Sequence, residues 1–386
     1  MKIALIIERL DPTGGGAEQW TVALARFLAG RGHIIHILTF SASAIPGLTA
    51  HIHVLPPGRT CLDQARHVAA ALAPLMPIIV HDTGTSASGD VFQPQTGSRL
   101  LSQARLVATH PPWLRLRAAI SPMSIGWRRN MTRLEALQVR RAVRVIAVSG
   151  LVRTHLVRQH ALDPATIDIL PNGVDVARFA PARLLPLRAV TREQLGLGQA
   201  VVYLASAFNL WLKGVDTAMH AVAQLAGAGA DVRLVVAGGV PDAAWHRRAA
   251  GLGIAERVHF VGAVADMVPL FAAADVLVHP TRWDACSLST IEAAAAAMPA
   301  ITTVENGAAD LIEDGRTGFV LPDPNDAQAL HARMQVLQDP AARHRMGQAA
   351  LAASASHDIG HNLAAVERAL ASAAEVTARR PQPAGR

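Results

Sequence analysis

Two acidic residues, Asp284 and Glu292, stand eight positions apart in the stretch HPTRWDACSLSTIEAAAAAM. Cys286 and several hydroxyl residues lie between them, but no His does, so the pattern does not predict a hydrolytic triad. Carboxylates accept hydrogen bonds from ligand hydroxyls, and acids in nucleotide sites bind the ribose diol in this way. We therefore expect Glu292 to bind a ribose and Asp284 to hold hydroxyls of the group attached to its phosphates. The alternative is that both acids only favour the start of a helix through its dipole.

The start of the helix expected after Asp284 offers a place for a phosphate. Ser287, Leu288 and Ser289 stand at this start. The first backbone N–H groups of a helix have no acceptor within it, and the helix dipole favours an anion there. We expect these three amides to bind a phosphate, while the alanines that follow allow the helix to pack closely on a sheet.

Lys213 precedes Gly214 at the start of another expected helix, in the stretch FNLWLKGVDTAMHA. Of the 36 lysines and arginines in the chain, only Lys2 and Lys213 are lysines. A compact ammonium in so arginine-rich a chain indicates a specific use, and a cation beside free helix-terminal amides makes a phosphate site. The alternative is an ordinary surface lysine.

A run of three glycines, Gly14, Gly15 and Gly16, follows the first apolar run in DPTGGGAEQW. Glycines allow a tight turn and the close approach of a ligand to backbone amides at a helix start. The pattern is not the dinucleotide fingerprint G-x-G-x-x-G, and a plain strand-to-helix turn is the alternative.

Strand and helix signals alternate along the chain and position these residues. KIALIIE and HIIHILTF have the pattern of buried strands on either side of the helix AEQWTVALARFLAGRG. After residue 195, the apolar runs AVVYLAS, VRLVVAGG, VHFVG and VLVHP alternate with further helices. Such alternation predicts parallel sheets built from βαβ units. Two sets of units predict an α/β chain with two Rossmann-like domains.

The domain boundaries follow from where these signals stop. We place the N-terminal domain at residues 1–170, completed by a C-terminal helix at 357–378, and the C-terminal domain at 196–356. Residues 171–195 are rich in proline and in loop signals, and we assign them to a hinge. Residues 379–386 are expected to be disordered.

Length and composition bound the class of protein. A chain of 386 residues exceeds one ordinary core, and 51% hydrophobic with 17% charged residues is typical of a folded protein. Cys61 and Cys286 fit neither a disulfide framework nor a metal spacing, which favours a reducing cytosol. The apolar run 3–7 is too short for a signal peptide, and no apolar run is long enough to predict a membrane span.

Positive charge is concentrated between residues 101 and 160, which hold eleven arginines and one acid, while the whole chain has a net charge of +7. In residues 109–144 arginines stand among aromatic and aliphatic residues, as an interfacial membrane contact requires. We assign to this membrane or acceptor patch Trp113, Arg115, Arg117, Trp127, Arg128 and Arg129. Prolines 111, 112 and 122 exclude one long amphipathic helix. The alternatives are a core with solvated arginines, or a nucleic-acid surface, for which no recognised fold is present.

Together these motifs resemble the family 4 glycosyltransferases of the GT-B fold over nearly the whole chain. The resemblance rests on GGGAE, VIAVSGLVRTHL, IDILPNGVDVARFAP, LKGVD, NGAADLIEDGRTGFVLPDPND and the D-x7-E spacing, a form of the family's E-x7-E motif. HDTGTSASGDVFQP and HPTRWDACSLSTIEA look closest to the glucosyltransferases of the lipopolysaccharide core and their relatives. The resemblance implies two Rossmann-like domains facing a central cleft.

The resemblance also implies a retaining, metal-independent hexosyltransferase that uses a nucleotide diphosphate sugar as co-substrate and no cofactor. The donor would lie mainly on the C-terminal domain and the acceptor on the N-terminal domain. Lys213 matches the lysine that contacts the diphosphate, Asp284 the acid that contacts the donor sugar, and Glu292 the ribose-binding acid. Gly15 and Gly16 match the loop that approaches the donor phosphates.

Asp90, in SGDVF, matches a position near the reaction centre in the closest relatives. Asp90, Lys213 and Asp284 are therefore the catalytic candidates. The chain departs from the family pattern at two places: Trp211 occupies the region where an Arg usually precedes the KG pair, and Gln95 stands where relatives often carry a His.

The function we predict is sugar transfer to a glycan or lipid-linked acceptor in the synthesis of cell-envelope polysaccharide or lipopolysaccharide. The expected partners are the nucleotide sugar donor, this acceptor and an anionic membrane surface, and not nucleic acid. The expected location is the cytoplasm, peripheral on the inner face of the cytoplasmic membrane. One alternative is a non-catalytic GT-B protein that binds a membrane or a partner, which the changes at Trp211 and Gln95 would support. The second alternative is another Rossmann-type enzyme, but the missing dinucleotide fingerprint argues against it.

Overall fold

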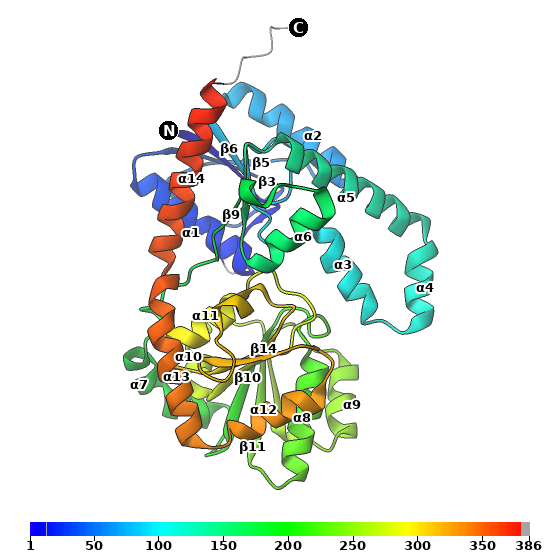
Figure 1. Cartoon of the computed structure of the whole chain (residues 1–386), viewed down its shortest axis with the longest axis vertical. Helices are drawn as coiled ribbons and strands as arrows, with labels where there is room; N and C mark the ends of the chain where they lie inside the picture. Colours follow the sequence, from blue (N-terminus) through cyan, green and yellow to red (C-terminus); the bar gives the residue numbers. More distant parts are fainter. Residues whose placement is uncertain (13, 380–386) are drawn as a thin grey trace. The chain divides into compact units, whose positions relative to one another are not determined.

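The computed structural model describes residues 1–12 and 14–379. These residues form two compact units (Figure 1). The first unit comprises residues 1–171 and the chain from residue 362 onward, and the second comprises residues 172–361. In each unit, helices pack around a parallel sheet. The predicted α/β class with two Rossmann-like domains is therefore confirmed.

The sheet of the first unit contains seven of the described strands, in the order β5–β3–β1–β6–β7–β8–β9, and all neighbours run parallel. Its strands are β1 (Lys2–Ile6), β3 (Ile34–Thr39), β5 (His51–Val54), β6 (Ile79–Asp82), β7 (Val91–Phe92), β8 (Arg144–Ala147) and β9 (Ile167–Ile169). β1 and β6 are almost fully buried because helices cover both faces of a parallel sheet.

The remaining elements of the first unit connect these strands. Its helices are α1 (Gly16–Gly30), α2 (Cys61–Leu72), α3 (Arg99–Ala108), α4 (Pro112–Ile120), α5 (Pro122–Arg141), α6 (Gly150–His160) and most of α14 (Ile359–Arg379). Two short strands, β2 (Arg9–Leu10) and β4 (Ser41–Ala42), pair with each other, and η1 (Ala73–Leu75) and η2 (Pro164–Thr166) are single 3₁₀ turns. α4 and α5 each begin at a proline, which is tolerated in the first turn because its missing N–H has no helical partner. The prediction that the prolines exclude one long helix is therefore confirmed.

The sheet of the second unit has the strand order β12–β11–β10–β13–β14–β15 in the part of the chain that is described. Its strands are β10 (Val201–Ala207), β11 (Val232–Gly238), β12 (Val258–Gly262), β13 (Val276–His279), β14 (Ala300–Thr303) and β15 (Gly318–Leu321). In chain order this is 3-2-1-4-5-6, the doubly wound arrangement of dinucleotide-binding domains. The order reverses between β10 and β13, and ligands of such sheets bind outside the carboxyl ends of the strands at this point.

Helices cover both faces of this second sheet. They are α7 (Pro181–Gln194), α8 (Val215–Gly227), α9 (Ala243–Gly251), α10 (Val268–Ala273), α11 (Leu288–Ala295), α12 (Ala327–Val336) and α13 (Pro340–Ser354), with 3₁₀ turns η3 (Ala255–Arg257), η4 (Gly307–Leu311) and η5 (Ala355–His357). Ala293 and Ala295 of α11 are fully buried in one core with Leu277 of β13. Alanines at these positions bring the helix close to the sheet, as the sequence predicted.

Part of the predicted hinge, residues 171–195, is not a loop, because α7 fills most of it. Arg192 on α7 is buried, and its guanidinium donates to Asp275 (3.3 Å) and to the carbonyl oxygens of Ala200 (2.5 Å) and Ala273 (2.8 Å). Arg188 on the same helix donates to the other oxygen of Asp275 (2.5 Å). Two arginines therefore fix α7 to the second unit. Sequence reasoning missed this because prolines at the start and inside the helix have the appearance of loop signals.

The chain passes between the units a second time near α14. Within the second unit, two backbone hydrogen bonds join Val174 to the start of α14. Val174 N donates to His357 O (3.0 Å), and Ile359 N donates to Val174 O (2.9 Å). In the first unit, Trp20 donates its indole N–H to Asn362 (2.7 Å), which donates to Pro171 O (2.6 Å). Most of the C-terminal helix thus belongs to the first unit. Of the predicted tail, residues 380–386 lie outside the described residues.

Within the described residues, no helix is both long and apolar enough to cross a membrane.

The anchoring of α7 can be tested by removing its buried guanidinium. Arg192→Ala leaves Asp275 with one partner fewer and strips several buried carbonyl oxygens of their donor. Breaking a buried ion pair costs about 3–5 kcal/mol, so we expect the free energy of unfolding in urea to fall by that amount. Arg183→Ala is the matched control, because Arg183 lies exposed on the same helix. Equal unfolding curves for the two variants would contradict this role of Arg192.

Candidate functional site

Two loops meet at the reversal point of the second sheet. The first follows β10 and carries Lys213, and the second follows β13 and carries Asp284. β10 and β13 are adjacent and parallel, so both loops leave the carboxyl edge of the sheet at neighbouring positions. The backbone N–H of Arg282 donates to Leu212 O (2.8 Å), which joins one loop to the other.

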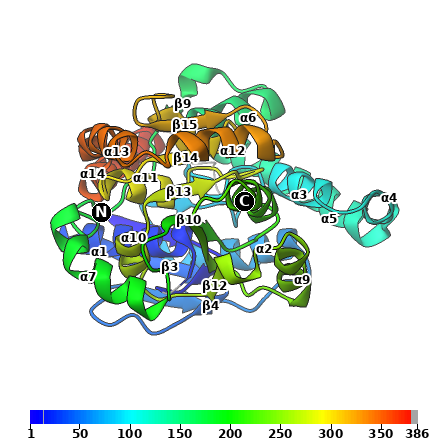
Figure 2. The same cartoon turned by 90° about the horizontal axis from the view of Figure 1, so that it is seen from below.

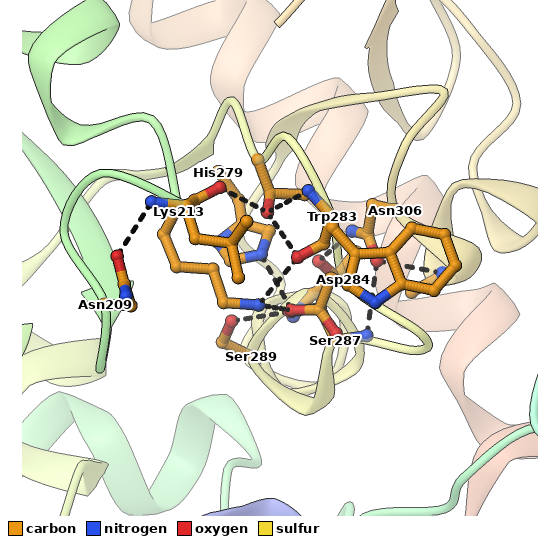
Figure 3. A network of polar contacts seen from close by, with 12 residues as sticks. Asn209, Lys213, His279, Trp283, Asp284, Ser287, Ser289 and Asn306 are labelled. Atoms are coloured by element: carbon orange, nitrogen blue, oxygen red, sulfur yellow. Dashed lines mark hydrogen bonds and ion pairs between the residues drawn. The ribbon is translucent and has the colours of Figure 1, made fainter. Parts of the chain in front are cut away.

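Lys213 and Asp284 form an ion pair at this edge (Figure 3). Lys213 Nζ lies 2.5 Å from Asp284 Oδ2 and 3.3 Å from Trp283 O. His279 Nε2 lies 3.1 Å from the same Oδ2. The side chains of Lys213 and Asp284 are 19% and 17% exposed, so most of the pair is buried but part of it reaches solvent. Two of the three predicted catalytic residues are thus in direct contact.

The loop that holds Lys213 depends on a glycine. Gly214 has a φ of 70°, and a Cβ at this position would lie 2.0 Å from Pro280 O. Only glycine fits both the left-handed conformation and the close approach of the second loop. Asn209 fixes the rest of the turn, because its side chain accepts from Leu212 N (2.9 Å) and its carbonyl accepts from Lys213 N (2.9 Å).

The electrostatics of this edge lower the pKa of Asp284 and of the imidazole behind it. Burial opposes ionisation of Asp284, but the charge of Lys213 and the hydrogen bond from His279 outweigh it and hold the pKa of Asp284 well below its usual range. Burial lowers the pKa of His279, and Asp284 offsets this only in part. Since an ionised carboxylate only accepts hydrogen bonds, His279 must carry a proton on Nε2 and donate this N–H as a hydrogen bond to Asp284.

α11 begins at Leu288, four residues after Asp284. Ser287 caps the helix by accepting from Thr290 N (3.4 Å), and its own N–H donates to Asn306 Oδ1 (3.2 Å). The amide of Ser287 is therefore already occupied, and it is not one of the free amides that the sequence predicted. The amides of Leu288 and Ser289 are in the first turn, where no intrahelical acceptor exists, and they remain the candidates for a phosphate.

Asn306 was not predicted, although it braces this edge. It is 1% exposed, and its Oδ1 also accepts from Ala308 N (3.0 Å). Its Nδ2 donates to Thr290 Oγ1 (3.1 Å) and Thr302 Oγ1 (2.9 Å). One amide side chain therefore ties α11 to β14 and to the loop after it. The only signal in the sequence was the Asn-Gly pair after an apolar run, which is typical of a turn.

Glu292 lies one turn into α11 and is half-buried. Burial raises its pKa to about 7, while Arg178 acts in the opposite direction and Asp266 in the same one. No hydrogen bond to its carboxylate is formed by any residue in the described part of the chain. A desolvated acid whose carboxylate accepts no hydrogen bond from the described residues, near the start of a helix, has the chemistry of a group that accepts ligand hydroxyls.

Trp211, one of the two departures from the family pattern, contacts residues of α9. Its ring packs against that of Trp245 on α9, with 4.7 Å between ring centroids, and the guanidinium of Arg248 lies 4.9 Å from its ring centroid. Trp211 therefore serves the packing of α9 against the loop, and its carbonyl also accepts from Arg282.

The predicted glycine loop belongs to the first unit and follows β1 and β2. Gly15 caps α1 and Gly16 is its first residue. The φ of Gly15 is −71°, an ordinary value, so backbone conformation alone does not require glycine here. The small size of these residues remains the property that suits close approach of a ligand.

Asp90 lies at the amino end of β7, away from the carboxyl edge of its sheet. Its carboxylate accepts from Val80 N (3.0 Å) on β6 and lies 3.6 Å from Arg141 Nη2. Its backbone carbonyl accepts from Val143 N (2.7 Å). These contacts hold neighbouring strands together, and the geometry does not favour the predicted catalytic role of Asp90.

Gln95, the other departure, follows β7 at the carboxyl edge of the first sheet and is buried. Within the described residues, neither its Nε2 nor its Oε1 has a hydrogen-bond partner. The same holds for Gln93 Nε2 and for Nδ1 of His81, whose Nε2 contacts Gln93 Oε1 (2.9 Å). The change from a His to Gln95 thus keeps a polar group at this edge.

The predicted basic patch occupies an arm formed by α3, α4 and α5, with α4 at its outer end (Figure 1, Figure 2). Trp113 is 65% exposed and Met123 is 83% exposed. Leu116, Ile120, Ile125 and Trp127 are exposed as well. The alternative that these apolar residues form a core is therefore wrong. Arg128 donates to Ala119 O (2.9 Å) at the end of α4, which fixes α4 against α5.

No group of three or more His, Cys, Asp or Glu side chains within residues 1–12 and 14–379 is arranged to hold a metal ion.

Family models match both units. The model described as Glycosyltransferase Family 4 matches residues 14–178, and the model described as Glycosyl transferases group 1 matches residues 198–339. The first match covers most of the first unit, and the second covers most of the second unit.

Curated relatives carry names of sugar transferases. The D-inositol 3-phosphate glycosyltransferase of Streptomyces scabiei is 33% identical over 227 residues, which are 55% of this chain and 50% of that protein. The GDP-mannose-dependent alpha-(1-6)-phosphatidylinositol monomannoside mannosyltransferase of Mycolicibacterium smegmatis is 34% identical over 196 residues, which are 48% of this chain and 50% of that protein. The chain thus spans about half the length of these relatives.

Solved structures match the chain over nearly its whole length. WaaG, a glycosyltransferase involved in lipopolysaccharide biosynthesis, is 21% identical with a TM-score of 0.81, covering 95% of this chain and 99% of WaaG. Anabaena HepE in complex with UDP-glucose is 20% identical with a TM-score of 0.73, and the match covers 96% of this chain and 100% of HepE. The sucrose-phosphate synthase of Thermosynechococcus elongatus is 19% identical with a TM-score of 0.76, and the match covers 98% of this chain and 100% of the synthase. These likenesses show the fold, which is the predicted GT-B fold.

The raised pKa of Glu292 predicts a dependence of stability on pH. The folded chain keeps this proton up to about pH 7, whereas the unfolded chain loses it near the ordinary value of 4.5. The folded state therefore binds more protons between these values, and Glu292 lowers stability as pH rises through this range. We expect Glu292→Gln to raise the melting temperature by roughly 2–6 °C near pH 8 and by less near pH 5.

Glu193→Gln, at an exposed position of α7, is the control for removing one acid. A gain in melting temperature that is the same at both pH values, or no gain, would show that Glu292 is not desolvated.

Proposed function

Because the chain belongs to the family 4 glycosyltransferases, we propose that it transfers a hexose from a nucleotide diphosphate sugar to a glycan or lipid-linked acceptor, with retention of configuration. The observation that carries this proposal is the Lys213–Asp284 pair, which lies at the reversal point of the second sheet beside the start of α11. A doubly wound sheet binds its ligand at this point, and an ammonium with free helix amides recognises a diphosphate.

The charges of this edge match the chemistry of donor cleavage. When the bond between the anomeric carbon and the β-phosphate oxygen breaks, negative charge develops on the phosphate. Lys213 and the amides of Leu288 and Ser289 would stabilise that charge from fixed positions. The acceptor oxygen bonds to the anomeric carbon on the same face, and its proton passes to the departing phosphate oxygen. These groups supply the positive charge, so we propose a transfer that needs no metal ion.

Glu292 supplies the second contact of the proposed donor site. Its half-buried carboxylate stands one turn beyond the amides of Leu288 and Ser289. The two hydroxyls of a ribose could each donate to it, and Asp284 would hold a hydroxyl of the sugar. The solved structure of HepE with UDP-glucose gives a related fold that binds such a donor.

We place the acceptor with the first unit and its arm at a membrane surface, in the synthesis of an envelope glycan. Exposed apolar side chains stand beside several arginines on α4 and α5, which is what an interfacial contact with anionic lipid needs. WaaG acts in lipopolysaccharide biosynthesis, and the Mycolicibacterium relative is named for a phosphatidylinositol mannoside. Both names are consistent with a lipid-linked acceptor.

The donor site is tested by a thermal-shift screen over nucleotide sugars, followed by turnover of those that stabilise the chain. Lys213→Ala should lower kcat by about 10²–10³-fold and change the donor KM much less, because its charge matters most in the transition state. Lys2→Ala is the matched control, because Lys2 is the other lysine and donates to Leu75 O in the first unit.

An effect on KM alone would show that Lys213 binds the donor without stabilising the transition state. If no nucleotide sugar stabilises the wild-type chain or is turned over by it, the chain is a non-catalytic member of the family.

The arm is tested by co-sedimentation with vesicles at low and high salt. Each arginine near an anionic leaflet contributes about 1 kcal/mol, and salt weakens this attraction. We expect the fourfold variant Arg115→Gln, Arg117→Gln, Arg128→Gln and Arg129→Gln to lose most binding to anionic vesicles. The control changes four exposed arginines elsewhere to Gln: Arg183, Arg247, Arg345 and Arg368. Equal binding of both variants, or equal binding to neutral vesicles, would rule out this role of the arm.

A further inference from the structure

His279 ends β13 and lies behind the Lys213–Asp284 pair (Figure 3). Its side chain is 2% exposed, so it contacts the pair from the protein interior. The strand fixes its backbone, because β13 is paired with β14 and His279 O accepts from Thr302 Oγ1 (2.9 Å). A buried imidazole on a central strand is far more rigid than the four-carbon side chain of a lysine.

The polar atoms of the pair differ in whether they have hydrogen-bond partners. Asp284 Oδ2 accepts from both His279 and Lys213, whereas Oδ1 accepts from none of the described residues. Lys213 has three N–H groups, of which one donates to Asp284 and one to Trp283 O. Among the described residues, Oδ1 of Asp284 and one N–H of Lys213 are therefore left without a partner.

We propose that His279 is a positioning residue for glycosyl transfer: its Nε2–H holds Oδ2 of Asp284 so that Lys213 and the free Oδ1 keep the orientation in which they meet the donor. This inference rests on the proposed function. The backbone of Asp284 is fixed by hydrogen bonds to Glu305 and Gly307, but these do not orient its carboxylate. Without His279, only the flexible Lys213 would restrain that carboxylate. The pair would then rotate, and the ammonium would lose its alignment with the leaving phosphate.

The experiment compares two substitutions that differ in one hydrogen bond. His279→Leu fills the buried space without a donor, whereas His279→Gln keeps an N–H at about the position of Nε2. A small misplacement of catalytic groups costs up to about a hundredfold in rate, so His279→Leu should lower kcat about 10- to 100-fold with a smaller change in donor KM. His279→Gln should restore most of the lost turnover.

His259→Leu is the matched control, because it also replaces a histidine by leucine on a strand of the second sheet. His259 lies on β12, and its Nε2 has no hydrogen-bond partner among the described residues. This variant should keep the turnover of the wild type.

A double-mutant cycle with Asp284→Asn decides whether His279 acts through Asp284. We expect His279→Leu to have little further effect on kcat in the Asp284→Asn background, because the bond it removes no longer holds a carboxylate. If His279→Leu lowers kcat there by the same factor as in the wild type, or if His279→Gln is as impaired as His279→Leu, then His279 serves packing alone and the inference is wrong.

Nitrogen NMR of the imidazole gives a readout that does not need turnover. The wild type should show one tautomer with the proton on Nε2, and Asp284→Asn should shift that signal. If the wild type transfers no sugar but the signal behaves in this way, the proposed function fails while the positioning contact stands. A signal that Asp284→Asn leaves unchanged would overturn the inference, even in an active enzyme.

Discussion

The ion pair between Lys213 and Asp284 is the interaction on which the second unit's site depends. Both side chains are about four-fifths removed from water. Desolvating two charges costs several kcal/mol per ion, and their attraction repays this only with good geometry and further hydrogen bonds. An apolar pair of similar volume would often stabilise a fold as well or better. The pair is therefore better explained by the donor binding that we propose than by a contribution to stability.

The surrounding structure keeps the two charges in place. Gly214 lets one loop pass against the other, where any Cβ would collide with Pro280. Asn306 ties α11 to β14, and this fixes the helix whose first amides would meet the same anion. α7, held by Arg192, completes the core beneath the sheet. A doubly wound sheet brings these parts to one edge because its strand order reverses there.

The sequence predicted those parts of this arrangement that depend on the alternation of strands and helices and on sequence motifs. Alternating strands and helices gave the two parallel sheets, and the spacing of Lys213 and Asp284 relative to apolar runs placed both at carboxyl ends of strands. It missed α7 because prolines concealed a helix that buried arginines hold in place. It also missed His279 and Asn306, whose roles depend on contacts between loops. Asp90 was expected near a reaction centre, but local resemblance does not show at which end of a strand a residue lies.

We propose that the Lys213 edge binds the diphosphate of a sugar donor. The most direct measurement is a crystal structure of the chain with a nucleoside diphosphate sugar bound. We expect a β-phosphate oxygen within about 3.2 Å of Lys213 Nζ and of the amides of Leu288 or Ser289, with the ribose hydroxyls on Glu292. A donor bound away from this edge, with Lys213 contacting only Asp284 and Trp283, would contradict the account.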